Sequence, residues 1–131
     1  MENLLKFYIN GEWVAPLSDA TMPVLNPATE KQIGTVALGN EADVDRAVAA
    51  ASTAFEEFSQ TSKDGRLALL RKVRAITEAR MEELAQAMRM EMGAPITMSR
   101  DVQADAAVGH LDGFITALEE LEERLKLANG D

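Results

Sequence analysis

The chain has 131 residues, of which 47% are apolar, a composition typical of one folded domain and too apolar for a disordered chain. Its 22 acidic residues exceed its 13 basic ones, and the resulting charge of −9 argues against nucleic acid or an anionic membrane as partner, because both need basic patches. The absence of cysteine excludes disulfides, thiolate metal sites and covalent catalysis through sulfur within these residues.

Two hairpins are predicted before residue 40. Asn10-Gly11 separates two apolar, aromatic-rich runs over residues 6–14, which is the strongest short signal for a two-residue hairpin turn. A second pair of strands is predicted at residues 22–25 and 32–37, on either side of the turn that begins at Asn26-Pro27. Two short hairpins are marginal in water, so we expect the aromatic side chains of the first to need a partner surface.

The first predicted helix begins after Asn40, a good N-cap with Asp43 three residues on. Apolar residues recur at helical spacing from there to Phe58, and residues 59–65 interrupt the pattern. A second helix is predicted over residues 66–92, where Gly93-Ala94-Pro95 supplies a left-handed cap followed by proline. Its apolar face comprises Leu70, Val73, Ile76, Met81, Leu84 and Met88.

A third helix is predicted from about residue 97 to residue 127. Gly109 and Gly113 lie inside it, and each costs about 1 kcal/mol relative to alanine, so we expect them to permit close contact with another helix. We also expect the three apolar stripes to pack on one another. The stripe of this helix comprises Val108, Leu111, Ile115 and Leu118, widened by Phe114 and Leu121.

The predicted fold class is therefore α+β and predominantly helical, with two short hairpins followed by three amphipathic helices. We treat residues 1–131 as a single segment, with the hairpins in 1–39 and the three-helix region in 40–131.

Neither a nucleotide site nor a catalytic triad is indicated. No two of the eight glycines are separated by a single residue, so the glycine fingerprint of dinucleotide-binding folds is absent. His110 is the only histidine, and on a helix Asp112 would point about 200° away from it, so it cannot orient the ring. We interpret His110 as a half-buried polar contact.

A helical di-metal site is not indicated either, because Ala107 stands where the Glu-x-x-His motif needs its glutamate. The acidic residues of the helices are interspersed with arginines and are interpreted as solvated faces. These residues are Glu78, Glu82, Glu119 and Glu123, with Arg74, Arg80 and Arg124.

Four methionines gather around the end of the second helix, and their helical spacing favours core filling over the alternative, an adaptable partner interface. They are Met88, Met90, Met92 and Met98.

Several segments, taken in order, resemble the amino-terminal region of the NAD(P)-dependent aldehyde dehydrogenase superfamily. Tyr-Ile-Asn-Gly-Glu-Trp starts at Tyr8, and Asn-Pro-Ala-Thr starts at Asn26. Residues 39–55 resemble the first helix of the family, whereas residues 66–71 and 90–95 resemble the two ends of the second. The resemblance implies a partial aldehyde dehydrogenase fold, from an enzyme that oxidises an aldehyde to an acid with NAD or NADP.

The chemistry of that family requires a cysteine nucleophile, a glutamate base, an oxyanion-hole asparagine and a nucleotide-binding sheet. All of these lie downstream of the matched region, so we assign no catalytic and no cofactor-binding residue here. The resemblance implies one minor site, for a monovalent cation, to which the backbone carbonyls of Val24 and Leu25 and the carboxylate of Glu91 contribute. Other members carry aspartate in place of this glutamate, and the remaining ligand of the site is expected beyond residue 131.

We therefore predict a truncated amino-terminal segment of an NAD(P)-dependent aldehyde dehydrogenase, inactive in isolation and binding no cofactor alone. Its expected partner is the remainder of that fold or a homologous subunit, with neither nucleic acid nor membrane. The alternative is a stand-alone helical interaction module that pairs through its hairpins. No signal peptide and no run of roughly 20 apolar residues is present, so a cytoplasmic location is expected.

Overall fold

The computed structural model describes residues 4–121. All its strands precede its helices, as the sequence predicts. In chain order the elements are β1 (Phe7–Ile9), β2 (Glu12–Val14), β3 (Thr21–Asn26), β4 (Lys31–Ala37), α1 (Glu41–Phe58), α2 (Lys63–Ala79), α3 (Met81–Met92), α4 (Ile96–Met98), the π-helix η1 (Ser99–Ala104) and α5 (Asp105–Glu120). The fold class is confirmed: two antiparallel hairpins are followed by a helical region.

The first hairpin has the two-residue turn that the sequence predicts. Asn10 and Gly11 adopt φ angles of 54° and 81°, both in the left-handed region that asparagine and glycine tolerate best. Opposite each other across the strands, the rings of Tyr8 and Trp13 lie 5.3 Å apart between centroids. Both side chains are more than half exposed, so the pair is open to a further surface.

The second hairpin is longer and contains an irregularity. Val24 pairs with Gly34 but Leu25 pairs with Gln32, so the register shifts between them. In the turn, the Asn26 carbonyl accepts a hydrogen bond from the Glu30 amide at 2.7 Å. Glu30 itself takes a left-handed φ of 58°, a position that the sequence does not signal because glutamate is an unusual residue there.

A capping box starts α1. The Asn40 side chain accepts from the Asp43 amide, and the Asp43 carboxylate accepts from the Asn40 amide, each at 3.1 Å. The other oxygen of this buried carboxylate accepts from the Leu17 amide at 2.9 Å. One side chain therefore ties the loop between the hairpins to the first turn of α1.

The second predicted helix is divided in two. Its N-cap is Ser62, whose hydroxyl accepts from the Gly65 amide, so it begins three residues earlier than expected. Arg80, with φ −112° and ψ 15°, separates α2 from α3. The break carries neither glycine nor proline, which is why the sequence pattern runs through it. The expected glycine cap at Gly93 is present, with φ 71°.

The third predicted helix begins at Ile96 and includes the π-helical segment η1. Its last described turn ends at Glu120, and Leu121 has extended geometry, so the predicted continuation over residues 122–127 lies outside the described residues. A π-helix has wider turns than an α-helix and no simple sequence signature.

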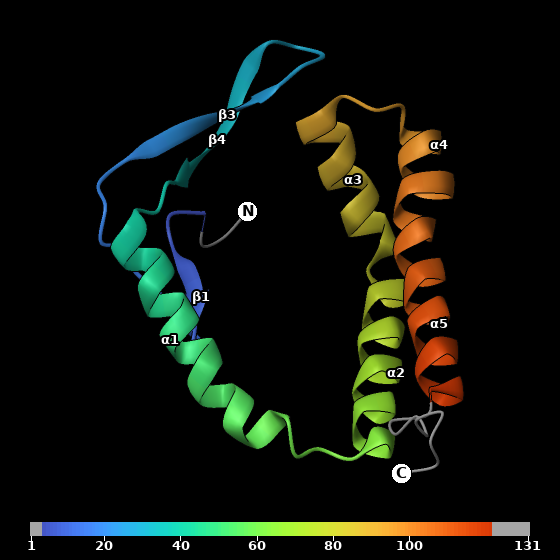
Figure 1. The fold of residues 1–131 in the computed structure, drawn as a ribbon. Coiled ribbons are helices and arrows are strands. Elements are labelled where there is room, and N and C mark those ends of the chain that lie inside the picture. Colours follow the sequence, from blue (N-terminus) through green and yellow to red (C-terminus); the bar gives the residue numbers. More distant parts are fainter. Residues whose placement is uncertain (1–3, 122–131) are drawn as a thin grey trace, which may run out of the picture.

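Most of the small core lies where the later helices pack on one another, and Ile9 of β1, beside α1, is a further buried apolar residue. α5 packs along α2, and η1 packs against α3 (Figure 1). The buried apolar residues of these contacts are Leu67, Ala85, Ala104, Val108 and Ile115. The predicted stripe of the third helix is thus confirmed at Val108 and Ile115.

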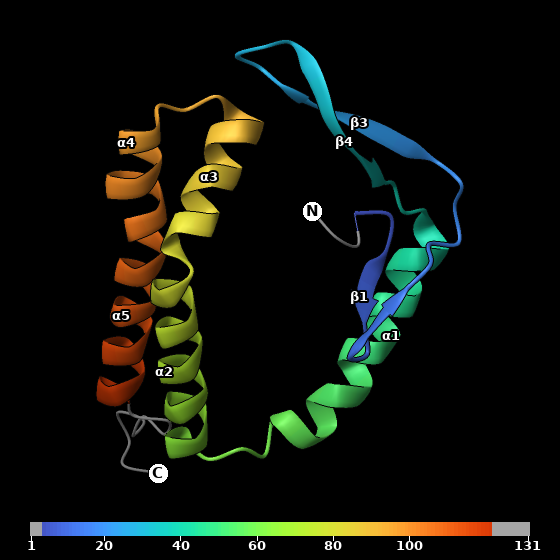
Figure 2. The same cartoon turned by 180° about the vertical axis from the view of Figure 1, so that it is seen from behind.

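α1 does not pack on the other helices, contrary to expectation. In both views it lies apart from α2 and α5 and is accompanied by the first hairpin (Figures 1 and 2). Its contacts are with β1, and Val44, Val48 and Phe55 are each about 60% exposed. No helix within residues 4–121 is long and apolar enough to cross a membrane.

Candidate functional site

The predicted cation ligands lie on two elements that contact each other, strand β3 and the end of helix α3. Val24 and Leu25 lie in β3, which contacts α3, and Glu91 lies in the last turn of α3. The hairpin tip reaches the end of α3 in both views (Figures 1 and 2). The topology therefore brings together two elements that are separated by more than fifty residues along the chain.

The donor chemistry of this place fits a hard cation. In the part of the chain that the structure describes, β3 is paired with β4 on one side only, so carbonyls that point away from β4 have no partner strand there. Glu91 is exposed, and its carboxylate has no hydrogen bond or ion pair within residues 4–121. Carbonyl and carboxylate oxygens are the ligands that hard cations prefer.

Where the hairpin tip meets the end of α3, the backbone of Gly93 lies close to the ring of Pro27. A Cβ built on Gly93 would lie 2.7 Å from Cγ of Pro27, so only glycine fits without a shift. The left-handed φ of Gly93 favours glycine for a second reason. Beside the contact is a hollow of ≈ 310 Å³, lined by the turn after β3, by the end of α3 and by Arg89.

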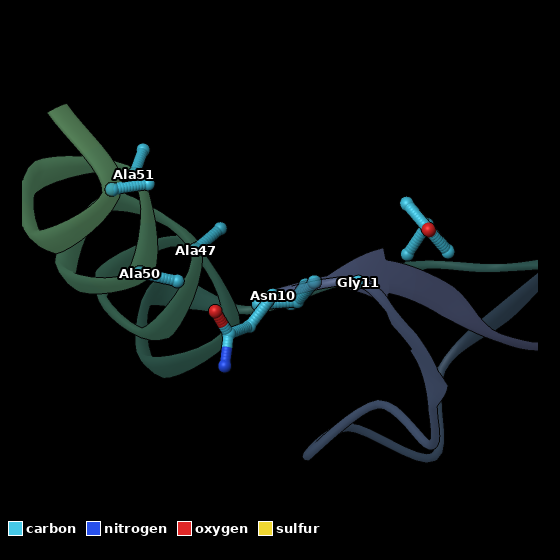
Figure 3. A pocket seen from close by; sticks show the side chains of 8 residues that line it. Asn10, Gly11, Ala47, Ala50 and Ala51 are labelled. Atoms are coloured by element: carbon cyan, nitrogen blue, oxygen red, sulfur yellow. The ribbon is translucent and has the colours of Figure 1, made fainter. Parts of the chain in front are cut away.

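A second, apolar surface surrounds α1 and the first hairpin. A hollow of ≈ 330 Å³ separates the β1–β2 turn from the alanine face of α1 (Figure 3). Asn10 and Gly11 line one side, and Ala47, Ala50 and Ala51 line the other. Together with the exposed Val44, Val48 and Phe55, these residues form what we call the α1 face. Exposed apolar surfaces of this kind mark sites of association.

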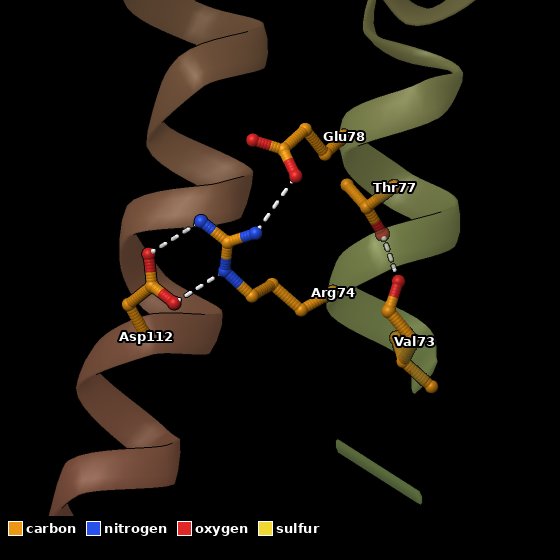
Figure 4. Close-up of polar contacts among 5 residues, drawn as sticks. All are labelled: Val73, Arg74, Thr77, Glu78 and Asp112. Carbon is orange, nitrogen blue, oxygen red and sulfur yellow. Dashed lines mark hydrogen bonds and ion pairs between the residues drawn. The ribbon is translucent and has the colours of Figure 1, made fainter. Parts of the chain in front are cut away.

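Ion pairs hold α2 against α5. The Arg74 guanidinium donates two hydrogen bonds to the Asp112 carboxylate, at 2.5 and 3.2 Å, and one to Glu78 at 2.8 Å (Figure 4). The hydrogen bonds from Arg74 lower the pKa of Asp112. Near the end of α5, Arg71 pairs with Glu119, and the Lys63 ammonium donates to the carbonyls of Glu119 and Leu121.

A further pair links α3 to η1. Arg100 binds Glu82 through two hydrogen bonds, at 2.7 and 3.0 Å. These bonds, with a smaller contribution from Gln86, lower the pKa of Glu82 to about 2. The predicted solvated faces are therefore exposed as expected, but they also join neighbouring helices; Glu123 and Arg124 lie outside the described residues.

Several other expectations are corrected. His110 is exposed and not half-buried, and Asp112 binds Arg74. A Cβ on Gly109 or Gly113 would meet nothing within 4 Å outside its own helix, so the expected close contact with another helix is not found among residues 4–121. Met90, Met92 and Met98 are 37%, 62% and 48% exposed and do not fill the core, which favours the alternative of an interface.

Sequence reasoning missed the residues that join the elements. Arg74, Arg71 and Lys63 belong to helix faces that resemble ordinary solvated surfaces, and their partners lie 38 to 58 residues away. No local spacing rule pairs such residues. The contact of Pro27 with Gly93 could have been suspected from the turn and cap signals at these positions, but not as one site.

Comparison with known proteins places this architecture in a known class. A sequence model of the aldehyde dehydrogenase family matches residues 13–130. The chain is 44% identical over 124 residues to the 3-succinoylsemialdehyde-pyridine dehydrogenase of a Pseudomonas species, covering 94% of this chain and 25% of that protein.

Solved structures agree. An aldehyde dehydrogenase from Bartonella henselae superposes with a TM-score of 0.92 at 36% identity, over 96% of this chain and 26% of that one. An aldehyde dehydrogenase C mutant from Pseudomonas syringae, in complex with NAD+ and octanal, gives a TM-score of 0.89 at 43% identity, over 92% and 25%.

The class is thus a partial α+β fold that corresponds to the amino-terminal quarter of much longer enzymes. The chain belongs to the aldehyde dehydrogenase family. It spans about a quarter of the length of the relatives it matches. The predicted amino-terminal segment is confirmed, and the alternative of a stand-alone interaction module is not favoured.

Proposed function

We propose that residues 1–131 act as the amino-terminal part of an NAD(P)-dependent enzyme that oxidises an aldehyde to a carboxylic acid. The observation that carries this proposal is the family match across residues 13–130. The relative solved with NAD+ and octanal supports both the cofactor and the substrate class. Other regions of the fold would supply the cysteine nucleophile, the base and the dinucleotide site.

In this proposal the chain alone binds no dinucleotide and turns over no aldehyde. It contains no cysteine, so these residues cannot provide the thiolate that the family uses to attack the aldehyde. Their contribution is a scaffold: hairpins and helices that present the α1 face to the remainder of the fold or to a homologous subunit. The chain works as one segment, with its hairpins in 1–39 and its helices in 40–131, in the cytoplasm.

A complementation assay tests this function. The purified chain is mixed with the complementary three quarters of a related aldehyde dehydrogenase, and NADH formation from NAD+ and an aldehyde is followed. We expect activity from the mixture and none from either part alone. NADH formation by the chain by itself would contradict the proposal, and so would an inactive mixture in which the two parts demonstrably associate.

We further propose the monovalent cation site formed by Val24, Leu25 and Glu91. Its support is the contact of β3 with α3 and, within residues 4–121, the unpaired edge of β3 and a Glu91 carboxylate without a hydrogen bond or ion pair. A Glu91→Gln variant keeps the size of the side chain and removes its charge, so we expect it to bind Na+ more weakly than the parent chain. Equal binding by the two chains would overturn the site.

A further inference from the structure

We propose that Asn10-Gly11 is a self-modification site: in the uncovered chain the Asn10 side chain deamidates without an enzyme and places a carboxylate in the α1 face. Both residues are exposed at the tip of the first hairpin. The Asn10 amide group points from the turn towards α1 (Figure 3) and has no hydrogen bond within residues 4–121. The modification stands independently of the proposed function, whereas its effect on association rests on that function.

The reaction needs only groups of the chain and water. The backbone nitrogen of Gly11, after losing its proton, attacks Cγ of Asn10; the new N–Cγ bond closes a succinimide ring, and the side-chain nitrogen leaves as ammonia. Water then opens either carbonyl of the ring and gives aspartate or isoaspartate. One water is consumed and one ammonia is released, without oxidation or reduction. Glycine hinders the attack least, because it carries no Cβ beside the attacking nitrogen.

The surroundings protect the other asparagines among residues 4–121. Asn26 precedes Pro27, whose nitrogen carries no hydrogen and cannot become the attacking group. Its side chain also accepts a backbone hydrogen bond at 2.9 Å. The Asn40 side chain accepts from the Asp43 amide at 3.1 Å in the capping box of α1, so it is held away from its own backbone. Asn10 has neither protection.

Opening of the first hairpin admits the reaction. Closing the succinimide ring requires rotation about the Asn10 backbone, which the paired turn resists, so the attack takes place while the hairpin is open. β1 and β2 have three residues each and form a sheet of two strands, and such a hairpin is marginal in water. A surface that covers the α1 face would keep the hairpin closed. The uncovered chain is therefore modified, and the associated chain is protected.

A carboxylate at position 10 is badly placed for association. Among the described residues, those that line the hollow between this turn and α1 carry no charge, and the chain as a whole already carries −9. When another surface covers the hollow, the carboxylate is buried without a cation, which is costly. Isoaspartate in addition lengthens the backbone of a two-residue turn, and the turn length sets the pairing of Ile9 with Glu12.

The first test ages the full chain in neutral and in mildly alkaline buffer and locates each converted asparagine by mass spectrometry of tryptic peptides. We expect conversion at Asn10, with isoaspartate among the products, and none at Asn26 or Asn40 over the same time. Conversion should be faster at the higher pH, because the Gly11 nitrogen must lose its proton. Asn129-Gly130, outside the described residues, is the same dipeptide and is scored separately. An Asn10 that stays intact while Asn129 converts overturns the proposal.

The second test compares association before and after ageing. Asn10→Gly is the matched control, because Gly-Gly suits the same turn and has no side-chain amide. Each aged chain is compared with its own fresh sample in the complementation assay. We expect the parent to lose activity in proportion to the fraction converted at Asn10, and Asn10→Gly to lose none. Ion exchange separates converted from unconverted parent, so that these two are also compared directly.

The outcomes separate this inference from the proposed function. Equal losses by the parent and Asn10→Gly, or full activity of the separated converted parent, overturn the effect on association. We also expect slower conversion at Asn10 when the chain is aged after mixing with the complementary part, and an unchanged rate would contradict protection by association. A fresh parent chain that does not complement refutes the proposed function instead, and the peptide analysis still decides the modification.

Discussion

At the scale of single residues, Asp43 joins three parts of the chain with one carboxylate. It accepts hydrogen bonds from the Asn40 and Leu17 amides and is only 4% exposed. Replacement by alanine leaves both amides without this acceptor. We expect Asp43→Ala to lower the free energy of unfolding by about 2–3 kcal/mol in urea titrations. Asp45→Ala, an exposed neighbour, is the control, and an equal effect of both would contradict this role.

Arg100 is the residue that sets the acidity of Glu82. Because the pKa of Glu82 is lowered from 4.5 to about 2, its ion pair stabilises the folded chain above pH 4.5. That contribution is lost as the pH falls through about 2. We expect Arg100→Gln to raise the pKa of Glu82 towards 4.5, as measured by NMR titration of its carboxyl carbon.

Arg89→Gln provides the comparison for this titration. Arg89 contacts Gln86 but not Glu82, so its loss should leave the pKa of Glu82 near 2. A carboxyl that titrates at the same pH in the parent and in Arg100→Gln would show that the ion pair does not form.

At the scale of elements, the two glycines of α5 do not serve a close helix contact among the described residues. Within residues 4–121, a Cβ placed on Gly109 or Gly113 would meet nothing within 4 Å beyond the backbone of its own helix, and both glycines are inside a regular helix. We expect Gly109→Ala and Gly113→Ala each to stabilise the isolated chain by about 1 kcal/mol, measured by urea unfolding followed by circular dichroism. Ala106→Gly is the reverse control, and stabilisation by it would refute the propensity argument.

The sequence predicts an element well where residues a few positions apart determine its turn or cap. The Asn10-Gly11 turn, the Asn40–Asp43 capping box and the Gly93 cap all depend on residues a few positions apart, and all are confirmed. The break at Arg80 and the π-turn of η1 have no such residue signal. They arise where α2 and α3 change partners along the α4–α5 helix.

At the scale of the whole molecule, the apolar stripe of α1 is real but its partner is absent from this segment. The sequence can show that a face is apolar and cannot show what covers it, so mutual packing of three helices was a reasonable but wrong expectation. The same reason explains the exposed methionines. The cation site could be predicted only through family resemblance, since backbone carbonyls leave no trace in the residue types.

The exposed α1 face should make the isolated chain prone to self-association. Phe55 is 63% exposed on this face. We expect Phe55→Asp to reduce concentration-dependent association in sedimentation experiments and to abolish complementation, because burying an unpaired charge is costly. Thr53→Asp adds the same charge on the opposite side of α1, about 160° around the helix from Phe55, and should change neither. Equal behaviour of the two variants would show that this face is not buried.

The wide turn of η1 is a place where the helix can gain or lose one residue. A π-turn is a single wide turn within an α-helix, in which one additional residue is accommodated. The side chains before and after it keep the directions that they have in a continuous α-helix. Removing one residue between Ser99 and Ala104 would leave a continuous α-helix with Val108 and Ile115 still directed at α2. We expect single-residue insertions and deletions among homologous sequences to be absorbed at this place.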